Sequence, residues 1–181
     1  VSVAVAEFPL VVDPLLTRTY EIGTLLPINA LDLDFATAEG VGGNRHLVAS
    51  AYAISGTDSD VRCNSRVLPS GERALLFSDI STEDSRHVSC AYVAGTDRWV
   101  LAWDAGDGFG TRRIRAHVHA VTDLTLRSNT TSFFNLSGVH DWRPDVGGTI
   151  GGSGPHALVV FQRETTSGSF AETANSEVVG A

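Results

Sequence analysis

Residues 100–103 read VLAW, a short apolar run that has two counterparts in the 181-residue chain. Residues 47–50 read LVAS and begin 53 residues before residue 100. Residues 158–161 read LVVF and begin 58 residues after it. Runs of this length between Gly, Ser and Asp clusters are typical of β-strands. Because the runs are apolar at consecutive positions, they predict strands that are buried on both faces. Their recurrence indicates an internal repeat.

The segments that flank these runs recur as well. Downstream, DVRCNSRV at 60–67 and RIRAHVHA at 113–120 alternate in polarity and carry Arg on one face. Upstream, DLDFA lies at 32–36, VSCAY at 88–92 and PDVG at 144–147. Each unit therefore reads as a strand, a Gly-rich turn, an apolar strand, an Asp/Gly-rich turn and an alternating strand.

A unit of about 50 residues with three or four antiparallel strands has the size of a β-propeller blade. We predict an all-β fold of propeller-like repeats, and an ordinary β-sandwich is the alternative. The predicted units are approximately 29–82, 83–138 and 139–181, and an N-terminal arm or junction occupies 1–28. Closed propellers have about four or more blades. We therefore expect self-association or neighbouring domains of a longer chain.

The two ends of the sequence give a related expectation. The chain contains no Met, and its last segment ends where the third Arg-bearing strand should begin. We expect the chain to be a processed product, a piece of something longer, or a subunit whose sheet edges are completed by neighbours. Unpaired strand edges would otherwise invite aggregation.

Charge and hydropathy exclude two classes of partner. The chain has 13 Lys+Arg against 21 Asp+Glu, a net charge of −8, and no basic run longer than Arg112-Arg113 followed by Arg115. Nucleic-acid binding is therefore not expected, because it needs a basic surface. No apolar run approaches the roughly 18 residues of a membrane span. An acidic surface favours calcium or neutral partners.

Three motifs together resemble a known family. They are PLVVDP at 9–14, PDVGG at 144–148 and LVVFQRE at 158–164, and the repeat units lie between them. The chain resembles large exported bacterial repeat proteins with propeller-like repeats. It departs from their pattern at Ser50, where an aromatic residue is usual, and at Arg113, where the strand lacks its acidic start. The resemblance implies a secreted or cell-surface, non-catalytic module for structure, adhesion or assembly, and it supplies no catalytic residues.

A carbohydrate-binding, lectin-like module is the second functional hypothesis. Exposed aromatic rings stack on the apolar face of sugars, and the aromatic candidates in turns are Phe109, Trp142 and Phe170. Trp142 is the strongest candidate, because its neighbours Asp141 and Arg143 can hydrogen-bond to hydroxyl groups. The alternative is that Trp142 packs over the edge of a blade, as large aromatic residues usually do.

Two segments have residue types that bind metals. Asp104 and Asp107 lie in an acidic, glycine-rich turn that can offer carboxylates and carbonyls to calcium, although Asp and Gly are also ordinary turn residues. His117 and His119 lie on one face of a predicted strand and can ligate zinc, or can simply be hydrogen-bonded histidines.

Cysteine and serine patterns leave two questions open. Cys63 and Cys90 each fall in a β-type segment, so adjacent strands could pair them in a disulfide, or they could remain free. A G-x-S-x-G nucleophile elbow is absent, because GGSGP at 151–155 lacks the final glycine. A hydrolase whose site is assembled from loops is the third hypothesis, and no catalytic residue is assigned to it.

Overall fold

A computed structural model of the chain describes residues 29–38, 44–68, 73–79, 81–106, 111–122, 131–133, 139–148, 156–164 and 176–180. Nearly all of these residues lie in β-strands, and the only helical segment among them is a single 3-10 turn, η1 (Ala94–Thr96). The prediction of an all-β fold is confirmed. No helix with the length and hydropathy of a membrane span occurs in the described part of the chain. The expected arm at 1–28 lies outside the described residues.

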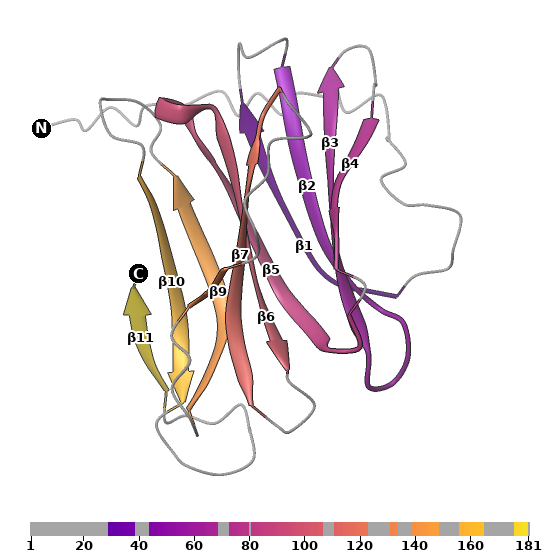
Figure 1. The fold of residues 1–181 in the computed structure, drawn as a ribbon, viewed down its shortest axis with the longest axis vertical. Helices are drawn as coiled ribbons and strands as arrows, with labels where there is room; N and C mark the ends of the chain where they lie inside the picture. The colour runs from indigo at the N-terminus through magenta and orange to yellow at the C-terminus, as the bar shows by residue number, and fades with distance from the viewer. Residues whose placement is uncertain are drawn as a thin grey trace, which may run out of the picture.

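Three consecutive antiparallel meanders make up the described structure (Figure 1). The first meander consists of β1 (Asn29–Ala38), β2 (Asn44–Ala53), β3 (Ser59–Leu68) and β4 (Arg73–Ser78). The second consists of β5 (Asp84–Val93), β6 (Arg98–Gly106), β7 (Arg112–Ala120) and β8 (Thr131–Phe133). The third consists of β9 (His140–Gly148), β10 (Ala157–Glu164) and β11 (Ser176–Gly180).

The strands form two sheets in the described residues. One has the order β1-β2-β3-β5-β6-β7-β8, with β4 paired to β3, and the other has the order β11-β10-β9. The first and second meanders belong to the same sheet through one parallel bridge, between Ser59 and Asp84. No closed ring of blades is present in the described part of the chain, and the arrangement is compatible with a sandwich. The division into repeat units remains a prediction.

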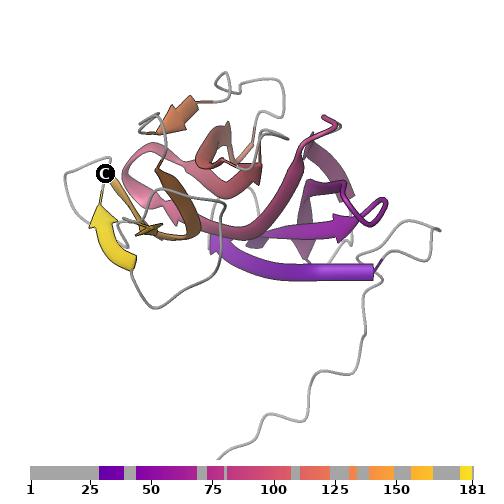
Figure 2. The same cartoon turned by 90° about the horizontal axis from the view of Figure 1, so that it is seen from below.

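The second meander lies between the other two. Figures 1 and 2 place its magenta and orange strands between the purple first meander and the gold third meander. β5 packs against β1 on one side and against β9 on the other. All residues of β6 from Trp99 to Ala105 are buried. The burial of this apolar run on both faces, which the sequence predicts, is therefore confirmed.

Two hydrophobic cores fill the spaces between the meanders. The core between the first and second meanders includes Leu47, Ala49, Val61, Cys63, Val88, Cys90, Trp99, Leu101 and Trp103. The core between the second and third meanders includes Ala91, Val100, Ala102, Ile114, Ala116, Val146, Val159 and Phe161. The side chains of β6 alternate between the two cores, which explains why its sequence has no polar face.

The third meander approaches the second very closely at Gly148. A Cβ atom at this position would lie 2.0 Å from the carbonyl oxygen of Tyr92 on β5. No side chain larger than hydrogen fits there without moving one backbone away from the other. The glycine therefore allows the ends of β5 and β9 to meet.

Candidate functional site

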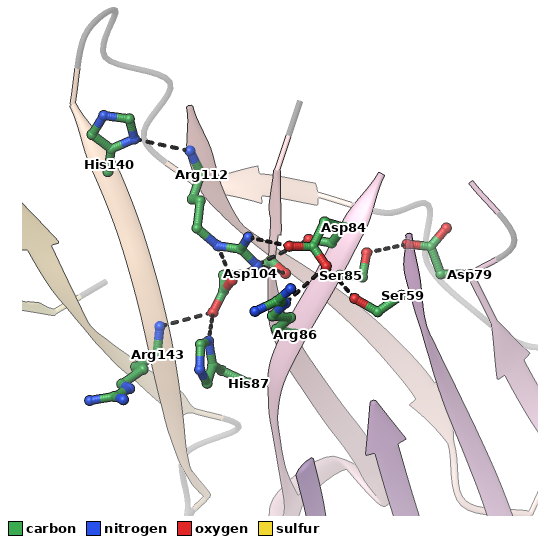
Figure 3. Close-up of polar contacts among 10 residues, drawn as sticks. All are labelled: Ser59, Asp79, Asp84, Ser85, Arg86, His87, Asp104, Arg112, His140 and Arg143. Carbon is green, nitrogen blue, oxygen red and sulfur yellow. Dashed lines mark hydrogen bonds and ion pairs between the residues drawn. The ribbon is translucent and has the colours of Figure 1, made fainter. Parts of the chain in front are cut away.

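The most developed polar cluster in the described structure surrounds Asp104 (Figure 3). Asp104 lies on β6, in phase with Val100 and Ala102, whose side chains face the third meander. The carboxyl group is therefore fully buried. A buried carboxylate is costly unless charged or hydrogen-bonding groups surround it.

Arg112 supplies the compensating charge from the first residue of β7. Its Nε donates to Asp104 Oδ1 at 2.5 Å, and its Nη2 also contacts that oxygen. Its Nη1 donates to Asp84 Oδ2 at 3.0 Å, so one guanidinium group links two carboxylates. Gly106 pairs with Arg112 across the strands, and a Cβ atom there would lie 3.4 Å from Nη1. A methyl group at this position would therefore be in van der Waals contact with the guanidinium group.

Asp84 completes this side of the cluster. Burial raises the pKa of its carboxyl group, but hydrogen bonds from Ser59, Arg86 and Arg112 outweigh that effect, so the pKa lies below its usual value of 3.8. Arg86 Nε donates to Asp84 at 2.9 Å, and the hydroxyl group of Ser59 donates from the first meander. Asp84 is therefore ionised at neutral pH and joins the first meander to the second.

The second oxygen of Asp104 is bound from two further strands. His87 Nδ1 on β5 lies 2.6 Å from Asp104 Oδ2, and the backbone N–H of Arg143 on β9 donates to the same oxygen at 3.0 Å. His87 and Arg143 both have left-handed backbones, with φ values of 46° and 47°. Each lies at a shift in strand register, opposite Trp103 and Phe161 respectively. These bulges turn both residues toward Asp104.

The chemistry available to the cluster is limited by these contacts. An aspartate bonded to a histidine is the arrangement that orients a catalytic base. In the described part of the chain, however, no serine, threonine or cysteine hydrogen-bonds to His87, and Arg112 already neutralises Asp104. The cluster joins β5, β6, β7 and β9. Among the described residues, the cluster offers the hydrolase hypothesis a candidate base and no nucleophile hydrogen-bonded to it.

The predicted sugar-binding residues lie on β9 beside this cluster. Trp142 is buried. The ring centroids of His87 and Trp142 lie 6.0 Å apart in an edge-to-face arrangement, and the Arg143 guanidinium carbon lies 4.4 Å from the Trp142 centroid. Asp141 is also buried and accepts two hydrogen bonds from Arg163 on β10, at 2.7 and 3.0 Å. The side chain of Arg143 is the exposed member of the three. Phe109 and Phe170 lie outside the described residues.

The Asp141–Arg163 pair also has an electrostatic signature. The hydrogen bonds from Arg163 to Asp141 raise the pKa of the guanidinium group, burial lowers it, and the charges of Asp141 and Glu177 raise it further. The net shift is upward. Asp141 is thus part of a buried bidentate pair that links β9 to β10.

Of the two predicted calcium residues, only Asp104 lies in the described structure. Both oxygens of Asp104 are occupied by Arg112, His87 and Arg143, and Asp107 lies outside the described residues. The calcium hypothesis for this pair stays untested. Across the described ranges, no group of three or more His, Cys, Asp or Glu side chains is placed to hold a metal.

The other titratable candidates are buried in pairs. His117 Nδ1 lies 2.9 Å from His119 Nε2 on the same face of β7, so the predicted common face is correct and the two rings bond to each other. Cys63 and Cys90 are free thiols in the core between the first and second meanders, and no disulfide joins them. Burial raises the pKa of both thiols, and the charge of Asp34 adds to the effect at Cys90.

A second polar feature crosses both boundaries between meanders. Ser89 on β5 donates to Asp34 Oδ2 on β1 at 3.0 Å and also lies 3.2 Å from Asp145 Oδ1 on β9. The backbone N–H of Cys90 donates to Asp34 at 2.7 Å, and that of Val146 donates to Ser89 Oγ at 3.1 Å. The first strands of all three meanders are thereby connected side by side.

Reasoning from the sequence did not predict that His87 and Arg112 contact Asp104, nor the Asp34–Ser89–Asp145 row. A usable signal was present for Arg112, since it lies in phase with the apolar Ile114 and Ala116 on β7. A charged residue at such a position predicts a buried ion pair. No protein-family model, no curated protein and no solved structure matches this chain significantly.

Proposed function

We propose that the chain is a non-catalytic, extracellular module of propeller-like blades that serves cell-surface structure, adhesion or assembly. Each meander corresponds to one blade in this proposal. The observation that carries it is the repeated packing of consecutive meanders, in which β5 packs against both β1 and β9. The resemblance of the PLVVDP, PDVGG and LVVFQRE motifs to exported bacterial repeat proteins supports an extracellular location.

The polar residues are consistent with a structural role. The buried carboxylates Asp104 and Asp141 are each bound to an arginine, and Asp84 joins two meanders. Groups that are fully occupied by protein partners stabilise the packing of strands and are not available to polarise a substrate. Charge-assisted contacts of this kind specify how strands pack together.

The proposal is tested on intact cells that produce the protein. An antibody against residues 29–180 is applied before and after permeabilisation, and a parallel sample is treated with protease added outside the cells. We expect labelling without permeabilisation and loss of the protein on external proteolysis. Labelling only after permeabilisation, with protection from the protease, would overturn the extracellular assignment. A cytoplasmic protein of the same cells serves as the control for lysis.

A further inference from the structure

Strand register defines equivalent positions in the three meanders. In each one, a residue of the second strand pairs with one residue of the first strand and one of the third: Asp34–Ala49–Cys63, Ser89–Ala102–Ala116 and Asp145–Val160–Gly180. Positions counted from these triplets can be compared directly. Each meander has a leading face toward the preceding meander and a trailing face toward the next one.

The trailing face is buried wherever a following meander covers it. Leu47 on β2 and its equivalent Val100 on β6 are buried, but the equivalent Leu158 on β10 is 56% exposed. The third strands give the same contrast, in a set of three equivalent residues: Val61 and Ile114 are fully buried, and Val178 is 77% exposed. The trailing face of the third meander is therefore an apolar surface that has no following meander in the described structure.

The leading face has the complementary pattern. Cys90 on β5 and its equivalent Val146 on β9 are buried against the preceding meander, but the equivalent Phe35 on β1 is 68% exposed. Leu33, two residues earlier on β1, is 56% exposed, and its equivalent Val88 is buried. On β1, the leading face of the first meander is thus a second apolar surface without a neighbour in the described structure. Adjacent exposed apolar residues of this size mark interaction surfaces.

A polar contact repeats at the same positions. The N–H of Cys90 donates to Asp34, and the N–H of the equivalent Val146 donates to Ser89. Asp145 is the next acceptor in this series and is exposed. The next donor is the N–H of Phe35, on the open edge of β1, where it bonds to its own neighbour Asp34 at 2.8 Å. Both end faces thus carry one half of the contact that the chain uses twice internally.

We infer that two copies of this chain associate head to tail, with the trailing face of the third meander (Leu158, Val178) of one copy packed on the leading face of the first meander (Leu33, Phe35) of the other. The contact continues the internal interfaces across the boundary between molecules. The inference rests on the proposed function, because it treats the meanders as equivalent blades. Such an interface is heterologous and forms a ring if it closes or a filament if it does not. Two copies would supply six blades, within the four to eight of closed propellers.

The test uses two variants that each damage one face. Phe35→Asp places a charge on the leading face of the first meander and leaves the trailing face of the third intact. Val178→Asp places a charge on the trailing face of the third meander and leaves the leading face of the first intact. Ile54→Asp is the matched control, because Ile54 is also a large apolar residue that is more than half exposed but lies in the turn after β2. Sedimentation velocity is measured for each protein from about 1 to about 100 µM, since association depends on concentration. Circular dichroism verifies that every variant is folded.

We expect the wild type and Ile54→Asp to sediment at twice the monomer mass of 19.2 kDa or more. Each face variant alone should stay monomeric, with affinity reduced about tenfold or more. An equimolar mixture of the two variants should form a 1:1 dimer. The intact trailing face of Phe35→Asp can still pack on the intact leading face of Val178→Asp. A monomeric wild type, a face variant that still assembles alone, or a mixture that stays monomeric would each overturn the inference. If the chain does not associate but intact cells are still labelled, the head-to-tail inference fails and the extracellular assignment stands. The two failures are therefore distinguishable.

Discussion

Ser89 donates a hydrogen bond to Asp34 at 3.0 Å across the boundary between the first two meanders. Asp34 also accepts the backbone N–H of Cys90, and Ser89 accepts that of Val146 from the third meander. A side chain of each first strand therefore satisfies the outward-facing N–H of the next one. Edge strands need such partners, because an unpaired buried N–H is costly.

Replacing Asp34 with Ala should therefore destabilise the packing of the meanders. The change leaves the N–H of Cys90 buried without its acceptor, which costs about 1–3 kcal/mol. Asp32→Ala is the control, because among the described residues the Asp32 carboxylate bonds to the N–H of its exposed neighbour Leu33 and to no other group. This change should alter stability by no more than about 0.5 kcal/mol. Urea denaturation measures both. Equal effects for the two variants would mean that the contact between β1 and β5 contributes nothing.

The Asp104–Arg112 pair should be the most sensitive point of the polar cluster. Asp104→Ala leaves a buried guanidinium group without its main counter-charge, which we expect to lower the free energy of unfolding by about 3–5 kcal/mol. The double variant Asp104→Leu/Arg112→Met should recover much of that loss, because both charges are removed. Arg86→Ala, at the exposed end, should cost about 1 kcal/mol or less. A double variant as unstable as the single one would contradict this explanation.

The lowered pKa of Asp84 predicts how the stability of the folded chain depends on pH. Its pKa is lower in the folded chain than the usual 3.8, so the folded state favours the ionised form. The stabilisation is present above that value and is lost as the pH falls through the folded pKa. We expect Asp84→Asn to be less stable than wild type at pH 7 and the gap to narrow below pH 3.8. Thermal denaturation at stepped pH measures this, and a constant gap would show that Asp84 does not titrate as described.

The lectin hypothesis can be tested without unfolding the chain. Trp142 is buried, so Trp142→Ala should cost about 3–5 kcal/mol and would confuse loss of binding with loss of structure. Arg143→Ala removes the exposed side chain of the same segment and keeps the backbone N–H that bonds to Asp104. We expect neither wild type nor Arg143→Ala to bind on a glycan array. Binding by wild type that folded Arg143→Ala lacks would favour the lectin over the structural module.

The sequence predicts the strands well because burial on two faces leaves a simple pattern. The run from Trp99 to Trp103 has no polar position, and a strand between two covered faces buries all of it. The recurring upstream segments DLDFA, VSCAY and PDVG likewise each lie in the first strand of a meander. The hydrophobic pattern and the position of each segment along the chain are therefore sufficient to predict the strands and much of their order.

The contacts of single side chains are harder to predict, because they depend on register and on neighbours. Trp142 looks like an exposed aromatic residue in sequence, yet a register shift in β9 buries it between His87 and Arg143. Leu47 and Leu158 are the same residue at equivalent positions, and one is buried while the other is exposed. Only the presence or absence of a following meander separates them, and no local pattern records that.

Hydrogen–deuterium exchange of the wild type at low and high protein concentration is the sharpest test of head-to-tail association, because it requires no substitution. If the two end faces meet as the internal faces do, amides of β1, including Phe35, and of β10 and β11 become protected together as concentration rises, while amides of β6, already buried, do not change. Protection at both ends at once is the predicted result. Exchange that is independent of concentration, or protection of only one end face, would contradict head-to-tail stacking of equivalent blades.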